Sequence, residues 1–153
     1  PDRFRANANW VELIEQLVYT YWDDIVIFLS GTAFEEQWVK DILDTLSPSA
    51  KHHVISICGT FNLFELAYFL TKCNLMISND TWPMHLAAAM GTKTIGLFWP
   101  NIPKIFGPWP LEKNISLYKG NGHIFIKPHL GIFKRDITCS INNIHVQDVF
   151  PYV

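Results

Sequence analysis

Apolar residues follow two alternating patterns along the first two thirds of the chain. Helical spacing of apolar or small residues predicts helices at about residues 9–22, 32–46, 63–70 and 82–90. Short continuous apolar runs predict strands at residues 25–29, 54–57, 74–77 and 94–98, the first of them typical of a strand buried on both faces. This alternation predicts an α/β fold with a Rossmann-like, mostly parallel sheet and helices on both faces.

The pattern changes after residue 98. Four prolines between positions 100 and 110 predict a long ordered loop. Two apolar segments at 117–118 and 124–126, separated by Gly120-Asn121-Gly122, predict a β-hairpin, with a loop at 128–134 after it. A last short helix is expected to start near His145.

Composition narrows the class of protein. A chain of 153 residues, 49% hydrophobic and 17% charged, fits one globular domain with a sizeable core. A net charge of -2 without a basic run argues against a nucleic-acid partner. The apolar runs are too short for a transmembrane helix, and no signal-peptide pattern is present. Cys58, Cys73 and Cys139 are widely spaced, which favours a reduced, cytoplasmic setting without a zinc site.

Loops rich in Gly, Ser, Thr or Asn follow each predicted strand. In an open parallel sheet, ligands bind beyond the carboxyl ends of the strands. We therefore expect the functional site among four loops, at residues 30–32, 59–60, 79–85 and 99–110.

The start of the helix at 82–90 is the strongest candidate site. Asp80 and Thr81 occupy helix-cap positions, and Pro83 suits the first turn. Asp80 and Thr81 either cap the helix only or join its N–H groups in binding phosphate. His85, one turn in, is either a structural residue of a core helix or a neutral donor to a phosphate oxygen.

Two residues of the loop and helix after the second strand are weaker candidates. Thr60 could donate to a phosphate or cap a helix. Glu65 falls in the first helical turn, where it could bond to a ribose hydroxyl or complement the helix dipole. P-loop, G-x-G-x-x-G and Ser-His-Asp motifs are absent from the sequence.

Residues 77–91 read I-S-N-D-T-W-P-M-H-L-A-A-A-M-G, and residues 96–101 read G-L-F-W-P-N. These segments resemble the motifs of glycosyltransferase family 9, the bacterial heptosyltransferases of lipopolysaccharide synthesis. That pattern is (V/I)-x-x-D-(T/S)-G-P-x-H-L-A-A-A-x-G, followed by F-G-P-T. Segments 59–67, 106–109 and 139–149 are similar to further family motifs, in the same order, so the resemblance spans most of the chain.

The resemblance implies the GT-B architecture, in which two Rossmann-like domains face a cleft. Residues 1–153 resemble the C-terminal, donor-binding domain, and because the chain begins at Pro1 we expect a fragment that lacks the N-terminal acceptor domain. The general base would be an Asp of that missing domain, so the chain alone is expected to be inactive.

The resemblance also assigns ligands and residues. A nucleoside-diphosphate sugar is the implied substrate, with no cofactor or metal, and a glycan or lipid-linked molecule is the acceptor. The protein would be cytoplasmic, with at most peripheral contact at the inner face of the bacterial inner membrane. The implied donor-binding residues are Asp80, Thr81 and His85 at the pyrophosphate and sugar, Thr60 and Glu65 towards the nucleoside, and Arg3, or Arg5 in its place, at a phosphate.

Trp82 and Trp99 stand where the family motifs have Gly. A glycine beside a phosphate allows close approach of the ligand to the backbone. An indole there narrows the site, stacks on a base or sugar, or blocks binding. Two alternatives therefore stay open: a non-catalytic scaffold domain whose pocket Trp82 and Trp99 close, and a nucleotide-sugar epimerase of related shape.

Overall fold

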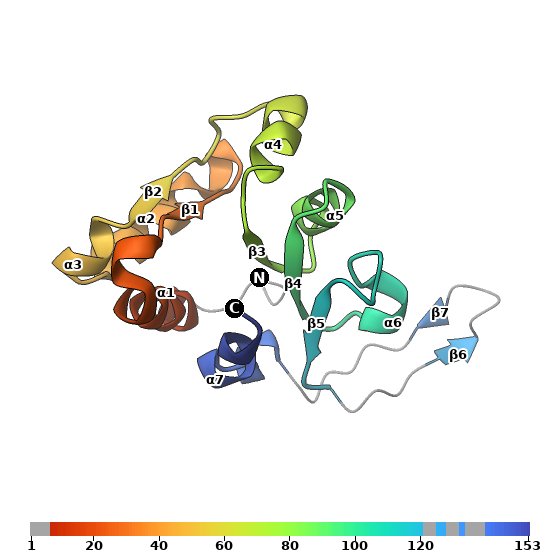
Figure 1. Ribbon diagram of the computed structural model, residues 1–153. Coiled ribbons are helices and arrows are strands. Elements are labelled where there is room, and N and C mark those ends of the chain that lie inside the picture. The colour runs from red at the N-terminus through yellow and green to blue at the C-terminus, as the bar shows by residue number, and fades with distance from the viewer. Residues whose placement is uncertain (1–6, 121–124, 128–131, 134–139) are drawn as a thin grey trace. The chain divides into compact units, whose positions relative to one another are not determined.

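The computed structural model describes residues 7–120, 125–127, 132–133 and 140–153. These residues belong to two compact units, which are coloured along the chain in Figure 1. The N-terminal unit contains the described residues up to Leu66, and the C-terminal unit contains the described residues from Ala67 to Val153.

The N-terminal unit packs helices against a two-stranded parallel sheet. Its strands β1 (Ile27–Leu29) and β2 (Val54–Ser56) pair with Ile27 opposite Val54. Its helical elements are α1 (Asn7–Tyr21), η1 (Trp22–Asp24), η2 (Ala33–Glu35), α2 (Glu36–Thr45), α3 (Pro48–Lys51) and the first half of α4 (Leu63–Leu70). The apolar stripes of α1 and α2 meet in one core, formed by Ile14, Val18, Ile42, Leu46, Ala50 and Val54.

The C-terminal unit is built on a three-stranded parallel sheet in the order β3-β4-β5. Its strands are β3 (Leu75–Asn79), β4 (Lys93–Phe98) and β5 (Ile115–Tyr118). Its other elements are α5 (Trp82–Ala89), α6 (Pro103–Phe106), the antiparallel pair β6 (Phe125–Lys127) and β7 (Ile132–Phe133), η4 (Ile141–Asn143), α7 (Val146–Val149) and η5 (Phe150–Tyr152). β4 lies between β3 and β5 and is buried from Thr94 to Phe98.

Helix α5 packs closely against β3 and β4 (Figure 1). Gly96 of β4 makes this approach possible, because a Cβ atom there would lie 2.6 Å from both Met84 Sδ and Phe98 Cε2. Met84 and Ala87 on the inner face of α5 are fully buried. The small side chains of α5 and the missing side chain of Gly96 therefore fix where this helix starts relative to the sheet.

The predicted α/β class with parallel strands and intervening helices is confirmed. The parallel strands fall in two sheets rather than one. The expectation that residues 25–29 form a strand buried on both faces is wrong, because Phe28 is 39% exposed.

The predicted hairpin between residues 117–118 and 124–126 is wrong. β5 instead pairs in parallel with β4, placing Leu117 opposite Leu97, and β6 pairs with β7. The free edge of the buried strand β4 would leave backbone N–H and C=O groups unpaired, and β5 satisfies them. Within the loops predicted at 100–110 and 128–134, the chain forms α6 and β7 respectively.

The short last helix is confirmed as α7, which begins after His145. Asp148 stabilises this start by accepting a hydrogen bond from the His145 backbone N–H at 2.9 Å. The same carboxylate forms an ion pair with Lys119 at 2.7 Å, which joins α7 to the end of β5. No helix in the described part of the chain is long and apolar enough to cross a membrane.

Replacing Gly96 with Ala should lower the free energy of unfolding by about 1–3 kcal/mol, the usual cost of overpacking a tight core. Urea unfolding measures this change. The companion variant Met84→Ala removes one of the two atoms that the new methyl group meets. Gly96→Ala should therefore cost less in the Met84→Ala background, and strictly additive costs would contradict the close packing described.

The ion pair predicts a pH-dependent stability. The hydrogen bond from Lys119, helped by the His145 N–H, holds the pKa of Asp148 below its ordinary value. A lowered pKa in the folded state stabilises the fold above the unfolded pKa, and this contribution is lost as the pH falls through the folded pKa. Lys119→Met should thus cost at most about 1 kcal/mol at pH 7, since the pair is partly exposed.

The cost of Lys119→Met should shrink towards zero as the pH falls below about 4, where the carboxyl of the unfolded chain is protonated. Chemical unfolding at a series of pH values measures it. Lys113→Met is the matched control, because Lys113 is exposed and forms no ion pair with the described residues. An effect of Lys119→Met that stays constant down to pH 3 would argue against this account.

Candidate functional site

The carboxyl ends of β3 and β4 place two loops next to each other. The strand register pairs Asn79 with Leu97, and the Asp80 N–H continues the ladder by donating to the Leu97 carbonyl at 3.1 Å. The segments that follow, 80–81 and 99–101, therefore leave the sheet from neighbouring positions. This is the edge of a parallel sheet at which ligands bind.

Thr81, rather than Asp80, is the N-cap residue of α5. Its backbone is extended, and its carbonyl accepts from the Met84 N–H at 3.1 Å. Its hydroxyl does not cap the helix, but lies 3.3 Å from the Asn79 carbonyl and 3.3 Å from Ser78 Oγ. The interpretation of Asp80 as a helix cap is therefore wrong, and no side chain in the described part of the chain caps the first turn of α5.

Asp80 instead faces the loop that follows β4. Its Oδ2 atom accepts a hydrogen bond from Nδ2 of Asn101, and both side chains are half-buried. The sequence analysis did not single out Asn101. The signal that could have found it is a polar side chain shortly after the end of β4, because adjacent parallel strands deliver their following residues to the same edge.

Trp82 and His85 both lie on the exposed side of α5. Trp82 is 55% exposed, and His85 is also exposed. The interpretation of His85 as a structural residue of a core helix is therefore wrong. The two rings lie about one helical turn apart, as residues at positions i and i+3 do.

Two buried polar atoms near this edge have no hydrogen-bond partner among the described residues. They are Oδ1 of Asn79, a residue only 6% exposed, and Nε1 of Trp99. A buried polar group left unpaired costs about 1–3 kcal/mol. Such costs are tolerated mainly where function, rather than stability, sets the local structure.

The candidates of the N-terminal unit lie at the start of α4. Thr60 is exposed, and its hydroxyl is 3.5 Å from the Cys58 carbonyl. Asn62 Oδ1 accepts from the Phe64 and Glu65 N–H groups at 2.9 and 3.0 Å, while Glu65 Oε2 accepts from the Asn62 N–H at 2.8 Å. This reciprocal cap confirms that Glu65 supports the helix start, and only its Oε2 takes part.

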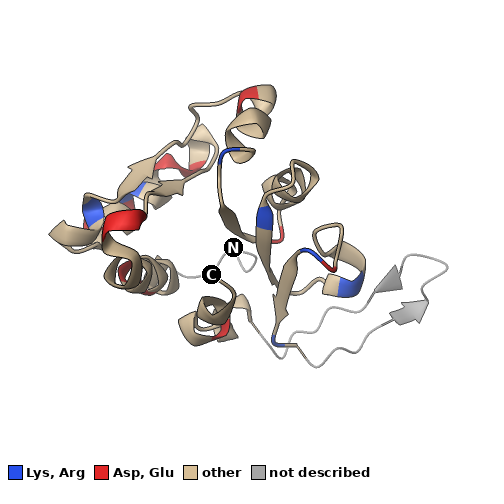
Figure 2. Cartoon of the chain, viewed as in Figure 1, with Lys and Arg blue, Asp and Glu red and all other residues tan. Residues whose placement is uncertain are grey.

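Arg3 and Arg5 lie outside the described residues, as does Cys139. Burial raises the pKa of the Cys58 and Cys73 thiols, which favours the unreactive protonated form. No group of three or more potential metal ligands occurs within the described ranges. In the described part of each unit, Lys residues are scattered among Asp and Glu (Figure 2).

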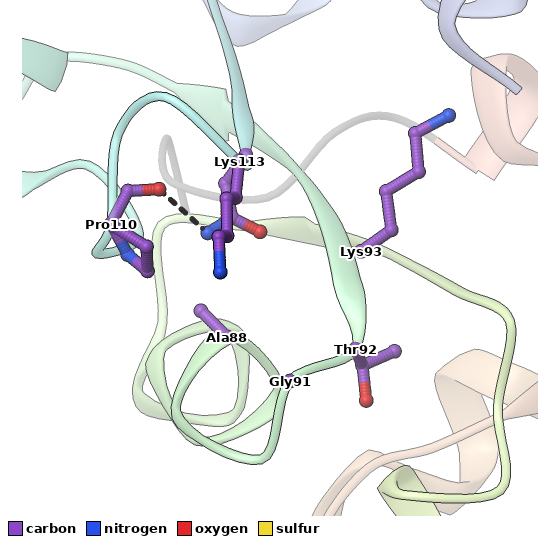
Figure 3. Close-up of a pocket in the computed structure, with 7 residues that line it drawn as sticks. Ala88, Gly91, Thr92, Lys93, Pro110 and Lys113 are labelled. Carbon is purple, nitrogen blue, oxygen red and sulfur yellow. Dashed lines mark hydrogen bonds between the residues drawn. The ribbon is translucent and has the colours of Figure 1, made fainter.

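A small cavity of about 140 Å³ lies at the opposite end of the sheet of the C-terminal unit (Figure 3). It is lined by Ala88, Gly91, Thr92, Lys93, Pro110, Lys113 and Asn114. Most of its polar groups already have protein partners: Thr92 donates to the Leu70 carbonyl, Lys93 to Tyr152 and Asn114 to Pro110. This cavity is therefore a weaker candidate than the edge at Asp80.

Comparisons with known proteins point to one family. The model of glycosyltransferase family 9 (heptosyltransferase) matches residues 6–127. The lipooligosaccharide heptosyltransferase 2 of Haemophilus influenzae is 26% identical over 108 residues, which cover 71% of this chain and 30% of that protein.

Solved structures share the fold. The E. coli ADP-heptose lipopolysaccharide heptosyltransferase II matches with a TM-score of 0.77 at 20% identity, over 99% of this chain and 41% of that one. The E. coli heptosyltransferase WaaC, solved with ADP and with ADP-2-deoxy-2-fluoro heptose, matches with TM-scores of 0.73 and 0.70 at 20% and 19% identity. These matches cover 99% of this chain and 39% and 38% of WaaC. The chain thus spans less than half the length of these proteins.

Proposed function

Since the chain belongs to glycosyltransferase family 9 (heptosyltransferase), we propose that it is the donor-binding domain of a sugar transferase. The whole protein would transfer a heptose or similar sugar from a nucleoside-diphosphate sugar to a lipopolysaccharide or other glycan. The observation that carries this proposal is the edge at residues 80–85, where an uncapped helix start lies beside a fixed carboxylate and two exposed rings.

The start of α5 suits the leaving group of the reaction. The acceptor hydroxyl attacks the anomeric carbon, the bond from that carbon to the phosphate oxygen breaks, and a nucleoside diphosphate departs with the electron pair. The helix dipole and the N–H of Trp82 stabilise the negative charge that develops, since Pro83 has no N–H and the Met84 N–H donates to the Thr81 carbonyl. Thr81 and His85 would add hydroxyl and imidazole donors to the same oxygens.

The remaining residues would recognise the rest of the donor. Thr60 and Glu65 are proposed to lie towards the nucleoside, with Oε1 of Glu65 available to a ribose hydroxyl because Oε2 is taken by the helix cap. Arg3 is proposed to contact a phosphate. More than half of the Trp82 indole is accessible, which supports stacking on a base or sugar over closure of the site.

Nucleotide binding separates this proposal from the scaffold alternative. Titration calorimetry against ADP, UDP and GDP should detect binding of one of them, and His85→Ala should weaken it about three- to tenfold, as expected for one lost hydrogen bond. His52→Ala is the matched control, because His52 is exposed outside the proposed site. If none of the three nucleotides binds, the scaffold domain becomes the better explanation.

The 153 residues by themselves should not transfer sugar, because they span less than half the length of their relatives and the general base is expected from the part that they do not match. Incubation with ADP-heptose and a deacylated lipopolysaccharide acceptor, followed by mass spectrometry, tests this expectation. A glycosylated acceptor formed by the 153-residue chain alone would contradict it.

A further inference from the structure

The hydrogen bond between Asn101 and Asp80 holds one of the two carboxylate oxygens of Asp80 in place within the candidate site. Asn101 Nδ2 donates to Asp80 Oδ2, while Oδ1 accepts no hydrogen bond from the described residues. The backbone of Asp80 is also fixed, because its N–H donates to the Leu97 carbonyl. Both the position and the rotation of this carboxylate are therefore constrained.

The loop that carries Asn101 is itself anchored. It leaves β4 after Phe98, which is fully buried, and passes through the buried residue Pro100. The Asn101 amide is thus held by the sheet on one side and reaches across to Asp80 on the other. Such support from a neighbouring side chain is what a binding group needs to keep one orientation.

The chemistry of a carboxylate limits what Asp80 can bind. An ionised carboxylate only accepts hydrogen bonds, and a diphosphate also offers only acceptors and negative charge. Asp80 therefore cannot attract the phosphates that the start of α5 favours. The groups of a nucleotide sugar that can donate to it are the hydroxyls of its two sugars and the amino group of its base. Of these, the hydroxyls of the transferred sugar lie nearest to the second phosphate.

We propose that Asn101 is a positioning residue, which turns Asp80 so that Oδ1 accepts a hydrogen bond from a hydroxyl of the transferred sugar. This inference rests on the proposed function. Asn101 itself touches no ligand in this account. Asn101 therefore affects how much more tightly the nucleotide sugar binds than the nucleotide without a sugar, because in this account only the sugar contacts Asp80.

The experiment compares two probes, ADP and ADP-heptose, by titration calorimetry on the full chain and its variants. Asn101→Leu keeps the side-chain shape but removes the donor. It should weaken binding of ADP-heptose about tenfold, the effect of losing a hydrogen bond to a charged group, and change ADP binding by less than about threefold. Asn101→Gln, which keeps the amide, should restore much of the preference for the sugar-bearing probe.

Two controls separate positioning from a general loss of structure. Asn74→Leu makes the same substitution at an exposed residue before β3, at the far end of that strand, and should leave both affinities unchanged. Thermal unfolding of each variant reports its folded fraction. A purely structural role of Asn101 would lower both affinities by the same factor, so the ratio of the two is the decisive readout.

An unchanged ratio in Asn101→Leu, or an unaltered chain that binds ADP-heptose no more tightly than ADP, would overturn the inference while leaving nucleotide binding intact. An unaltered chain that binds neither probe would instead overturn the proposed function, and the inference with it. A selective loss of the sugar-bearing probe that Asn101→Gln reverses is the result we expect.

Discussion

The close contact of α5 with β4 at Gly96 is the constraint on which the candidate site depends. A side chain at this position would meet Met84 and Phe98, so the helix can lie this near only because glycine is present. The buried alanines on the same helix extend the contact. Since protein interiors are packed to near-crystalline density, this contact constrains the position of the helix start against the sheet.

The site follows from that placement. The parallel pairing of β3 and β4 brings residues 80–81 and 99–101 to the same edge, and the helix start opens onto it. The hydrogen-bonding groups at this edge are used unequally. Asp80 is hydrogen-bonded to Asn101. By contrast, no side chain of the described residues caps the first turn of α5, and Asn79 and Trp99 each bury a polar atom that has no partner among those residues. The start of α4 differs, because there Asn62 and Glu65 each accept a hydrogen bond from the backbone N–H of the other.

Trp82 and Trp99 differ in their surroundings although both replace a family glycine. Most of Trp82 faces outward at the start of α5, while the indole nitrogen of Trp99 is enclosed. Trp82 is therefore available to a ligand or partner, whereas Trp99 is partly buried in the loop that leads to Asn101.

The sequence alone determined the α/β class, the longer helices, the parallel strands β1 to β4 and the motif at Asp80, because periodicity and turn residues act locally. Tertiary structure decided that β5 pairs with β4 and that β6 pairs with β7. The reason for the first pairing is that the buried backbone groups at the edge of β4 need hydrogen-bond partners, wherever in the sequence these come from. The same holds for Asp80, whose carboxylate faces Asn101 rather than its own helix. Spacing along the chain shows which side chains are present at an edge, but only the packed sheet decides which of them meet.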